Sequence, residues 1–204
     1  MRKIRSSINR NPENSGADYT ETEQDGTPVF RGNASNWNDI NLSINSLAPG
    51  ATAPGNFSIP GTSLQIKAFT GTGVTQSAHG SLEILHDYKE GTDIVPHIHW
   101  CPTTTGLGDV KWQLEYSWLN GGSTVTTSTT ITVTVAASGT VAHEQRTNFP
   151  AISGTGKLIG SRFVFRVFRD AADGADTYAA DAGAFDFGVH YERDTIGSRQ
   201  ITTK

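Results

Sequence analysis

Residues 110–119 read Val-Lys-Trp-Gln-Leu-Glu-Tyr-Ser-Trp-Leu, and apolar and polar side chains alternate along them from Val110 to Trp118. A period of two places successive side chains on opposite faces of a β-strand. Asn-Gly-Gly follows at 120–122, before a threonine-rich run over 124–134. Glycine at such a junction favours the tight turn of a hairpin. The stretch therefore predicts a half-buried strand of an antiparallel sheet.

Similar short apolar runs recur after residue 61, separated by glycine-rich segments. We expect eight strands, at about 64–69, 81–86, 94–101, 110–119, 125–135, 141–149, 158–169 and 184–192. The chain has only 9 Leu but 26 Thr and 22 Gly, a composition that favours strands and turns over helices. Short antiparallel strands without intervening helices predict an all-β fold, a jelly-roll-like antiparallel β sandwich.

Apolar residues are unevenly distributed along the chain. Leu, Ile, Val and Phe number 10 in residues 1–60 and 33 in residues 61–204. A segment this poor in apolar residues does not easily offset its ordering entropy. We therefore predict an extended N-terminal arm over 1–60, which docks onto or wraps a neighbour, and a β-sandwich domain over 61–204. Within the arm, Phe30 and Trp37 are candidate contact residues, and 30–44 has the pattern of a short strand or helical turn.

The charge argues against a nucleic-acid-binding protein. The formal net charge is −4, whereas phosphate neutralisation requires a basic face. Arg2, Lys3 and Arg5 form a short basic tip that is suited to an acidic partner surface. The single cysteine, Cys101, fits maturation in a reducing compartment, and no apolar run approaches the length of a membrane helix. We expect no nucleic acid and no membrane among its partners.

The segment 93–101 carries the strongest chemical signal. If it is a strand, His97, His99 and Cys101 share one face. Residues i and i+2 of a strand lie about 6–7 Å apart, close enough to converge on one ion. His97 and His99 are therefore a possible metal-binding pair, whereas Cys101 is too far along the strand from His97 to be a third ligand.

Three interpretations of the pair stay open. Gly91 followed by His97 and His99 matches the opening of the cupin metal motif, but the Glu expected after it is replaced by threonine. Three chains around a threefold axis would instead offer six imidazole nitrogens to one ion. The third interpretation is structural, with both histidines hydrogen-bonded to neighbouring strands or at a subunit interface. On the last strand Asp186, His190 and Glu192 share a face, which favours a surface ion-pair ladder.

Five stretches, in about residues 80–120 and 185–200, have a distinctive wording: His86–Thr92, Pro96–Trp100, Val110–Trp112, Leu114–Tyr116 and His190–Arg199. They resemble a group of bacteriophage virion structural proteins. The resemblance implies a capsid-decoration, neck or tail-fibre component, assembled in the host cytoplasm and located in the virion. It implies no reaction and no catalytic residue.

The sequence and the resemblance together predict a non-enzymatic virion protein. Its expected partners are further copies of the chain, as a trimer, and capsid, portal or tail proteins. One alternative is a receptor-binding or glycan-binding module that stacks sugars on aromatic rings, with Trp118, Tyr178 and Tyr88 as candidates. The other is the cupin-like metalloenzyme that uses His97 and His99. No cofactor is expected apart from such a metal ion.

Overall fold

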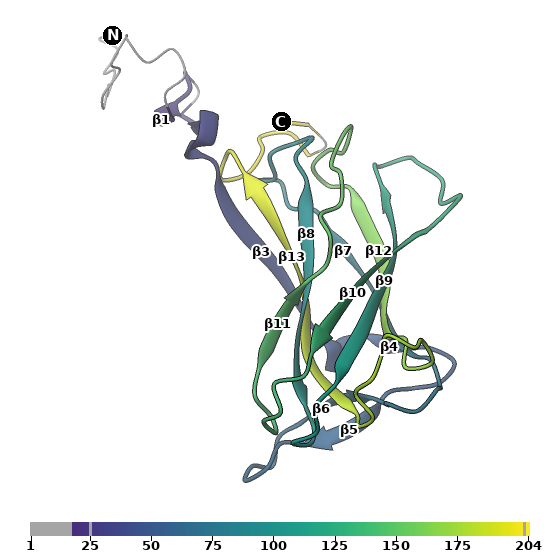
Figure 1. Ribbon diagram of the computed structural model, residues 1–204. Coiled ribbons are helices and arrows are strands. Elements are labelled where there is room, and N and C mark those ends of the chain that lie inside the picture. Colours follow the sequence, from purple (N-terminus) through teal and green to yellow (C-terminus); the bar gives the residue numbers. More distant parts are fainter. Residues whose placement is uncertain (1–17, 25, 202) are drawn as a thin grey trace.

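The computed structural model describes residues 18–24, 26–201 and 203–204. Two antiparallel sheets pack face to face around one core (Figure 1). The architecture is the predicted antiparallel β sandwich of jelly-roll type. Arg2, Lys3 and Arg5 lie outside the described residues.

The first sheet has five strands, in the order β10-β9-β12-β7-β4. Its members are β4 (Ala48–Pro49), β7 (Gln76–Glu83), β9 (Asp109–Leu119), β10 (Thr129–Ala136) and β12 (Arg162–Arg169). The hairpin expected from the 110–119 stretch is confirmed, since β9 and β10 pair antiparallel. Strand β10, however, starts four residues later than expected, because its register begins with Thr129 opposite Tyr116. Residues 120–128 form an exposed loop instead.

The second sheet has the strand order β11-β8-β13-β6-β5, and β3 also pairs with β13. Its members are β3 (Asn36–Ser43), β5 (Gly55–Ser58), β6 (Gln65–Phe69), β8 (Ile94–Pro102), β11 (Gln145–Asn148) and β13 (Ala182–Arg193). Two short 3-10 helices, η1 (Gly32–Ala34) and η2 (Ile44–Ser46), flank β3. Strand β13 is central because β8 pairs along one side of it while β3 and β6 share the other.

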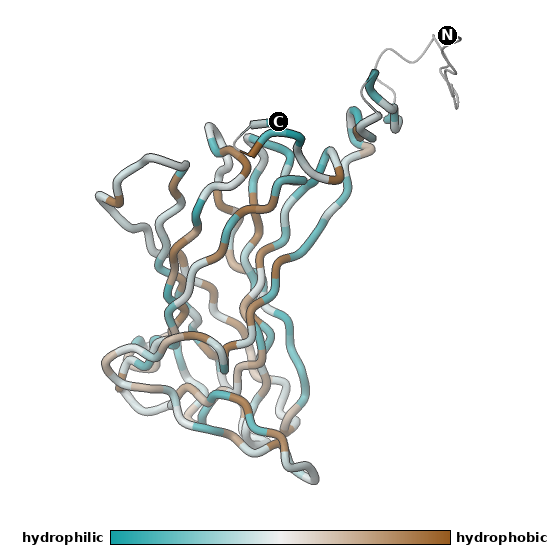
Figure 2. Tube along the Cα trace, turned by 180° about the vertical axis from the view of Figure 1, so that it is seen from behind, coloured by the Kyte–Doolittle hydropathy of each residue, from teal (hydrophilic) through white to brown (hydrophobic). Residues whose placement is uncertain are grey.

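The core forms where the period of two turns apolar side chains inward from both sheets. Brown and teal segments accordingly alternate along the strands (Figure 2). Phe165 of β12 stacks on Phe187 of β13, with ring centroids 4.2 Å apart. Trp112 of β9 meets Trp100 of β8 edge to face at 6.0 Å. These aromatic contacts join the two sheets, and each buried ring removes a large apolar area from water.

The sandwich begins well before residue 61, so the extended arm is shorter than the 60 residues expected from the sequence. Strand β3 pairs with β13 over its full length, and both β4 and β5 belong to the sheets. The low apolar content of this segment reflects its position, because edge strands need few core residues. Among the described strands, the hairpin of β1 (Tyr19–Thr22) and β2 (Pro28–Arg31) stands beyond the sandwich, at the N-terminal end in Figure 1.

The hairpin is tied to the sandwich through β2. Val29 is buried and forms a β-bridge with Thr195. The backbone N–H of Phe30 donates to the Asp194 carbonyl at 2.7 Å. Within the described residues, no helix is long and apolar enough to cross a membrane.

Candidate functional site

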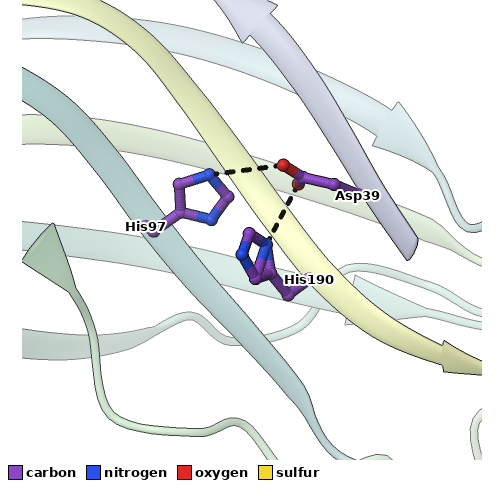
Figure 3. A group of neighbouring side chains, drawn as sticks. All are labelled: Asp39, His97 and His190. Carbon is purple, nitrogen blue, oxygen red and sulfur yellow. Dashed lines mark ion pairs between the residues drawn. The ribbon is translucent and has the colours of Figure 1, made fainter. Parts of the chain in front are cut away.

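Three polar side chains from three strands meet on the outer face of the six-stranded sheet. They are Asp39 of β3, His97 of β8 and His190 of β13, and they point toward one another (Figure 3). The strand register brings them together, because His190 pairs with Asp39 and Gly188 pairs with His97. We call these three residues the Asp39–His97–His190 cluster.

The polar atoms of the cluster are close but not hydrogen-bonded. His97 Nε2 lies 3.6 Å from Asp39 Oδ2, and His190 Nδ1 lies 3.3 Å from Asp39 Oδ1. Both ring nitrogens of His97, Nδ1 of His190 and Oδ1 of Asp39 are buried without a hydrogen-bond partner. Leaving such atoms unpaired is unfavourable, at about 1–3 kcal/mol for each group. The cluster is therefore a place where a ligand atom would satisfy buried polar groups.

Gly188 explains how His97 is buried on an outer sheet face. A Cβ at Gly188 would lie only 2.5 Å from Nε2 of His97, so the imidazole occupies the side-chain space that the glycine leaves free. The rings of His99 and His190 flank His97, with centroids 5.1 Å and 4.2 Å away. As a result the His97 side chain has no exposed surface.

Burial lowers the pKa of His97 to about 4, and the cationic forms of His190 and His99 and the charge of Arg146 act in the same direction. The Asp39 carboxylate opposes this shift without overcoming it. His97 is consequently a neutral imidazole at pH 7. A neutral imidazole carries a free lone pair, which is the form that binds metals.

His99 does not belong to this cluster, although it shares the outer face as expected. Its Nδ1 lies 2.6 Å from Glu144 Oε1 instead. His97 and His99 are neighbours on this face, with ring centroids 5.1 Å apart, but the ligand-type atoms that converge belong to His97, Asp39 and His190. Sequence reasoning placed His190 in a surface ion-pair ladder and gave Asp39 no role. Their proximity to His97 depends on pairing between distant strands, for which the sequence has no local signal.

Cys101, which follows His99 by two residues on the same strand, is buried, and burial raises the pKa of its thiol to about 11. It is therefore a protonated core thiol at pH 7.

Trp37 extends the polar face along β3. Its side chain is 56% exposed, it lies two residues before Asp39 on the same face, and it pairs with Glu192 across the strands. The Glu192 carboxylate is held in place, since it accepts hydrogen bonds from Ser35 Oγ at 3.0 Å and Lys89 Nζ at 3.1 Å. Trp37 thus has an exposed ring beside fixed polar groups.

The aromatic residues that the sequence suggested for sugar stacking are in the interior. Trp118, Tyr178 and Tyr88 are buried, and Tyr178 and Tyr88 hydrogen-bond to loop backbone. Their positions near strand ends and loops suggested exposure, but each ring turns into the core. Trp37, which the sequence predicted as an assembly contact, is the tryptophan that solvent reaches.

A separate cleft of about 370 Å³ lies at the loop between β9 and β10. Hydroxyl side chains from this loop and from β9 line it, with Lys157 at one side. The ammonium group of Lys157 is held by the backbone carbonyl of Trp118 at 2.6 Å.

The fold and this face together define an antiparallel β sandwich with a histidine–carboxylate cluster on one sheet. No sequence-family model matches the chain. No curated protein matches it either.

Several solved structures have a similar arrangement of strands. The CBM36-1 domain of a multidomain xylanase from the hindgut metagenome of Trinervitermes trinervoides matches with a TM-score of 0.42 and 15% identity, over 74% of this chain and 96% of that domain. An exo-beta-1,3-galactanase from Phanerochaete chrysosporium matches with a TM-score of 0.41 and 15% identity, over 82% of this chain and 31% of the enzyme. The carbohydrate-binding module CBM36, in complex with calcium and xylotriose, matches with a TM-score of 0.34 and 15% identity, over 73% of this chain and 97% of the module. At these TM-scores the likeness carries no conclusion about function.

Proposed function

We propose that this chain is a non-enzymatic binding module whose ligand is a glycan, held on the outer face of the six-stranded sheet around Trp37. The observation that carries the proposal is the exposed indole ring of Trp37 in line with fixed polar side chains. An aromatic face offers apolar contact to the C–H face of a sugar ring, while carboxylate, imidazole and amide groups bind its hydroxyls.

The polar groups are spaced as an extended ligand would need them. One face of β3 carries Trp37, Asp39 and Asn41 at every second position, about 6–7 Å apart. Asn41 Nδ2 donates to Asp39 Oδ2 at 2.8 Å, which orients the carboxylate. His190 and Glu192 lie across from them on β13. Rigid strands hold these groups in place, so little ordering is needed when a ligand binds.

The four tryptophans make this proposal testable by fluorescence. Trp37 is 56% exposed, whereas Trp100 and Trp112 are fully buried and Trp118 is 6% exposed. A glycan that stacks on Trp37 should protect the protein's fluorescence from a soluble quencher such as acrylamide. Glycans for this measurement are selected on a glycan array and then titrated into the full chain.

The decisive variant is Trp37→Ala, which should weaken glycan binding at least about fivefold, because stacking contributes about 1 kcal/mol or more. The matched control, Leu107→Ala, removes another exposed apolar side chain, 77% exposed, and should leave binding unchanged. Thr126→Ala tests the separate cleft. Silence on the array would overturn the proposal, as would binding that survives Trp37→Ala and is lost in Thr126→Ala.

We also propose a role in the assembly of a bacteriophage particle. The supporting observation is that the hairpin of β1 and β2 lies outside the sandwich. Of the hairpin's eight strand residues four are exposed, three are partly buried and Val29 is buried, so the hairpin presents exposed side chains outside the sandwich. The two roles are compatible, because a virion component can carry a glycan-binding face.

Deleting residues 1–30 tests this second role. Strand β3 is retained, so we expect a folded sandwich that no longer enters particles. The native mass of the full chain tests the expected trimer. Normal incorporation of the shortened chain would contradict an assembly function for this segment.

A further inference from the structure

We infer that the Asp39–His97–His190 cluster binds one divalent transition-metal ion within a single chain, with zinc as the representative ion. The ligands would be Nε2 of His97, Nδ1 of His190 and one carboxylate oxygen of Asp39. This site does not depend on the glycan proposal, because its ligands are complete without a sugar.

The spacing of the ligand atoms fits a tetrahedral ion. Metal–ligand bonds of about 2.0–2.1 Å place neighbouring ligands about 3.3 Å apart at the corners of a tetrahedron. In the cluster, Oδ2 of Asp39 lies 3.6 Å from His97 Nε2, and the other carboxylate oxygen, Oδ1, lies 3.3 Å from His190 Nδ1. The three ligand atoms lie within 4.8 Å of one another. Small side-chain adjustments would bring them around one ion.

The buried unpaired atoms give independent support for a ligand. His97 is fully buried, and its Nε2 points into the cluster without a hydrogen-bond partner (Figure 3). A plain ion pair between His190 and Asp39 would align an N–H with the carboxylate. Instead Nδ1 and Oδ1 come within 3.3 Å and neither makes a hydrogen bond. The two atoms face each other without a hydrogen bond, and a bound cation would give both of them a partner.

The donor types select the class of ion. Two imidazole nitrogens and one carboxylate suit zinc and its first-row neighbours, whereas calcium and magnesium take oxygen ligands. Asn41 fixes the carboxylate of Asp39 through its 2.8 Å hydrogen bond, in the way that outer groups commonly orient metal ligands. Asp39 and His190 are 32% and 25% exposed, so water can reach a fourth position on the ion.

The test uses the full chain stripped of metal with a chelator and titrated with Zn²⁺ by calorimetry. We expect one ion per chain. Asp39→Asn and His190→Gln keep the side-chain size and should each weaken binding more than about 100-fold, since each removes a direct ligand. Asp186→Asn and His99→Gln change the same sheet face outside the cluster and should leave the affinity unchanged. Ca²⁺ should not bind.

Each contrary outcome has a distinct meaning. Failure of Zn²⁺ to bind, or binding unchanged in Asp39→Asn, would overturn the site. If zinc binding is lost in His99→Gln but retained in Asp39→Asn, the ligands are His97 and His99 and the proposed site is wrong. One ion per three chains would point to a threefold axis. Circular dichroism of the metal-free variants checks their fold, and failure of glycan binding would affect none of these results.

Discussion

Gly188 and His97 are cross-strand neighbours, and the imidazole of His97 fills the space that a side chain at Gly188 would need. A Cβ there would lie 2.5 Å from His97 Nε2 and 2.2 Å from Asn41 Oδ1. The glycine on β13 therefore decides whether the histidine of β8 can face Asp39.

Gly188→Ala should displace the His97 ring and disrupt the cluster. We expect zinc affinity to fall about as far as in His190→Gln, with a loss of roughly 1–3 kcal/mol in the free energy of unfolding from the forced shift. Gly121→Ala is the control, because a Cβ there meets nothing within 4 Å. Unchanged zinc binding in Gly188→Ala would contradict this packing relationship.

Asp176→Asn should cost about 3–5 kcal/mol of unfolding free energy. Arg169 and Asp176 are each 1% exposed and form a bidentate pair, and Arg169 also donates to the Ala180 carbonyl. The variant would leave the Arg169 guanidinium buried without its counter-charge. Urea unfolding measures the change.

Glu83→Gln is the control for that experiment. It breaks the pair of Glu83 with Arg162, whose side chains are 45% and 52% exposed. An exposed pair contributes only about 0–1 kcal/mol. Equal effects of Asp176→Asn and Glu83→Gln would show that burial of the Arg169 pair has no energetic weight.

Ala142→Gly should raise the unfolding free energy, by up to about 1 kcal/mol. Ala142 has φ 58°, and among the described residues it is the only one other than glycine with positive φ. Glycine relieves the strain of the left-handed conformation at some cost in chain entropy. Ala172→Gly, at an exposed alanine with ordinary φ, should instead be neutral or destabilising. Thermal unfolding of both variants distinguishes the two effects.

Cys101 should not react with thiol reagents in the folded protein. It has no exposed surface, and burial raises its thiol pKa to about 11 because the thiolate is disfavoured away from water. At pH 8 the native chain should therefore be labelled slowly, and labelling should become complete in denaturant. Fast labelling of native protein would show that the strand around Cys101 opens readily.

The strands could be predicted because their signal is local. The alternation over 110–119 corresponds to β9 at Asp109–Leu119, and the segment 94–101 corresponds to β8 at Ile94–Pro102. In β9 the alternating apolar residues face the core as expected, and in β8 Ile98 and Trp100 face it. Strand β3 was harder, because an edge strand has a weak apolar pattern, and residues 36–43 were included in the expected arm.

The site could be predicted only in part, because the sequence signal describes one segment at a time. From the sequence alone it follows that His97 shares one strand face with His99, since a period of two assigns faces within one segment. The neighbours of His97 on other strands are set by the tertiary structure. Pairing of β13 with both β3 and β8 brings Asp39 and His190 to His97, and Gly188 leaves room for the ring. Strand pairing depends on contacts between residues far apart in the chain, so no pattern within segment 93–101 could reveal it.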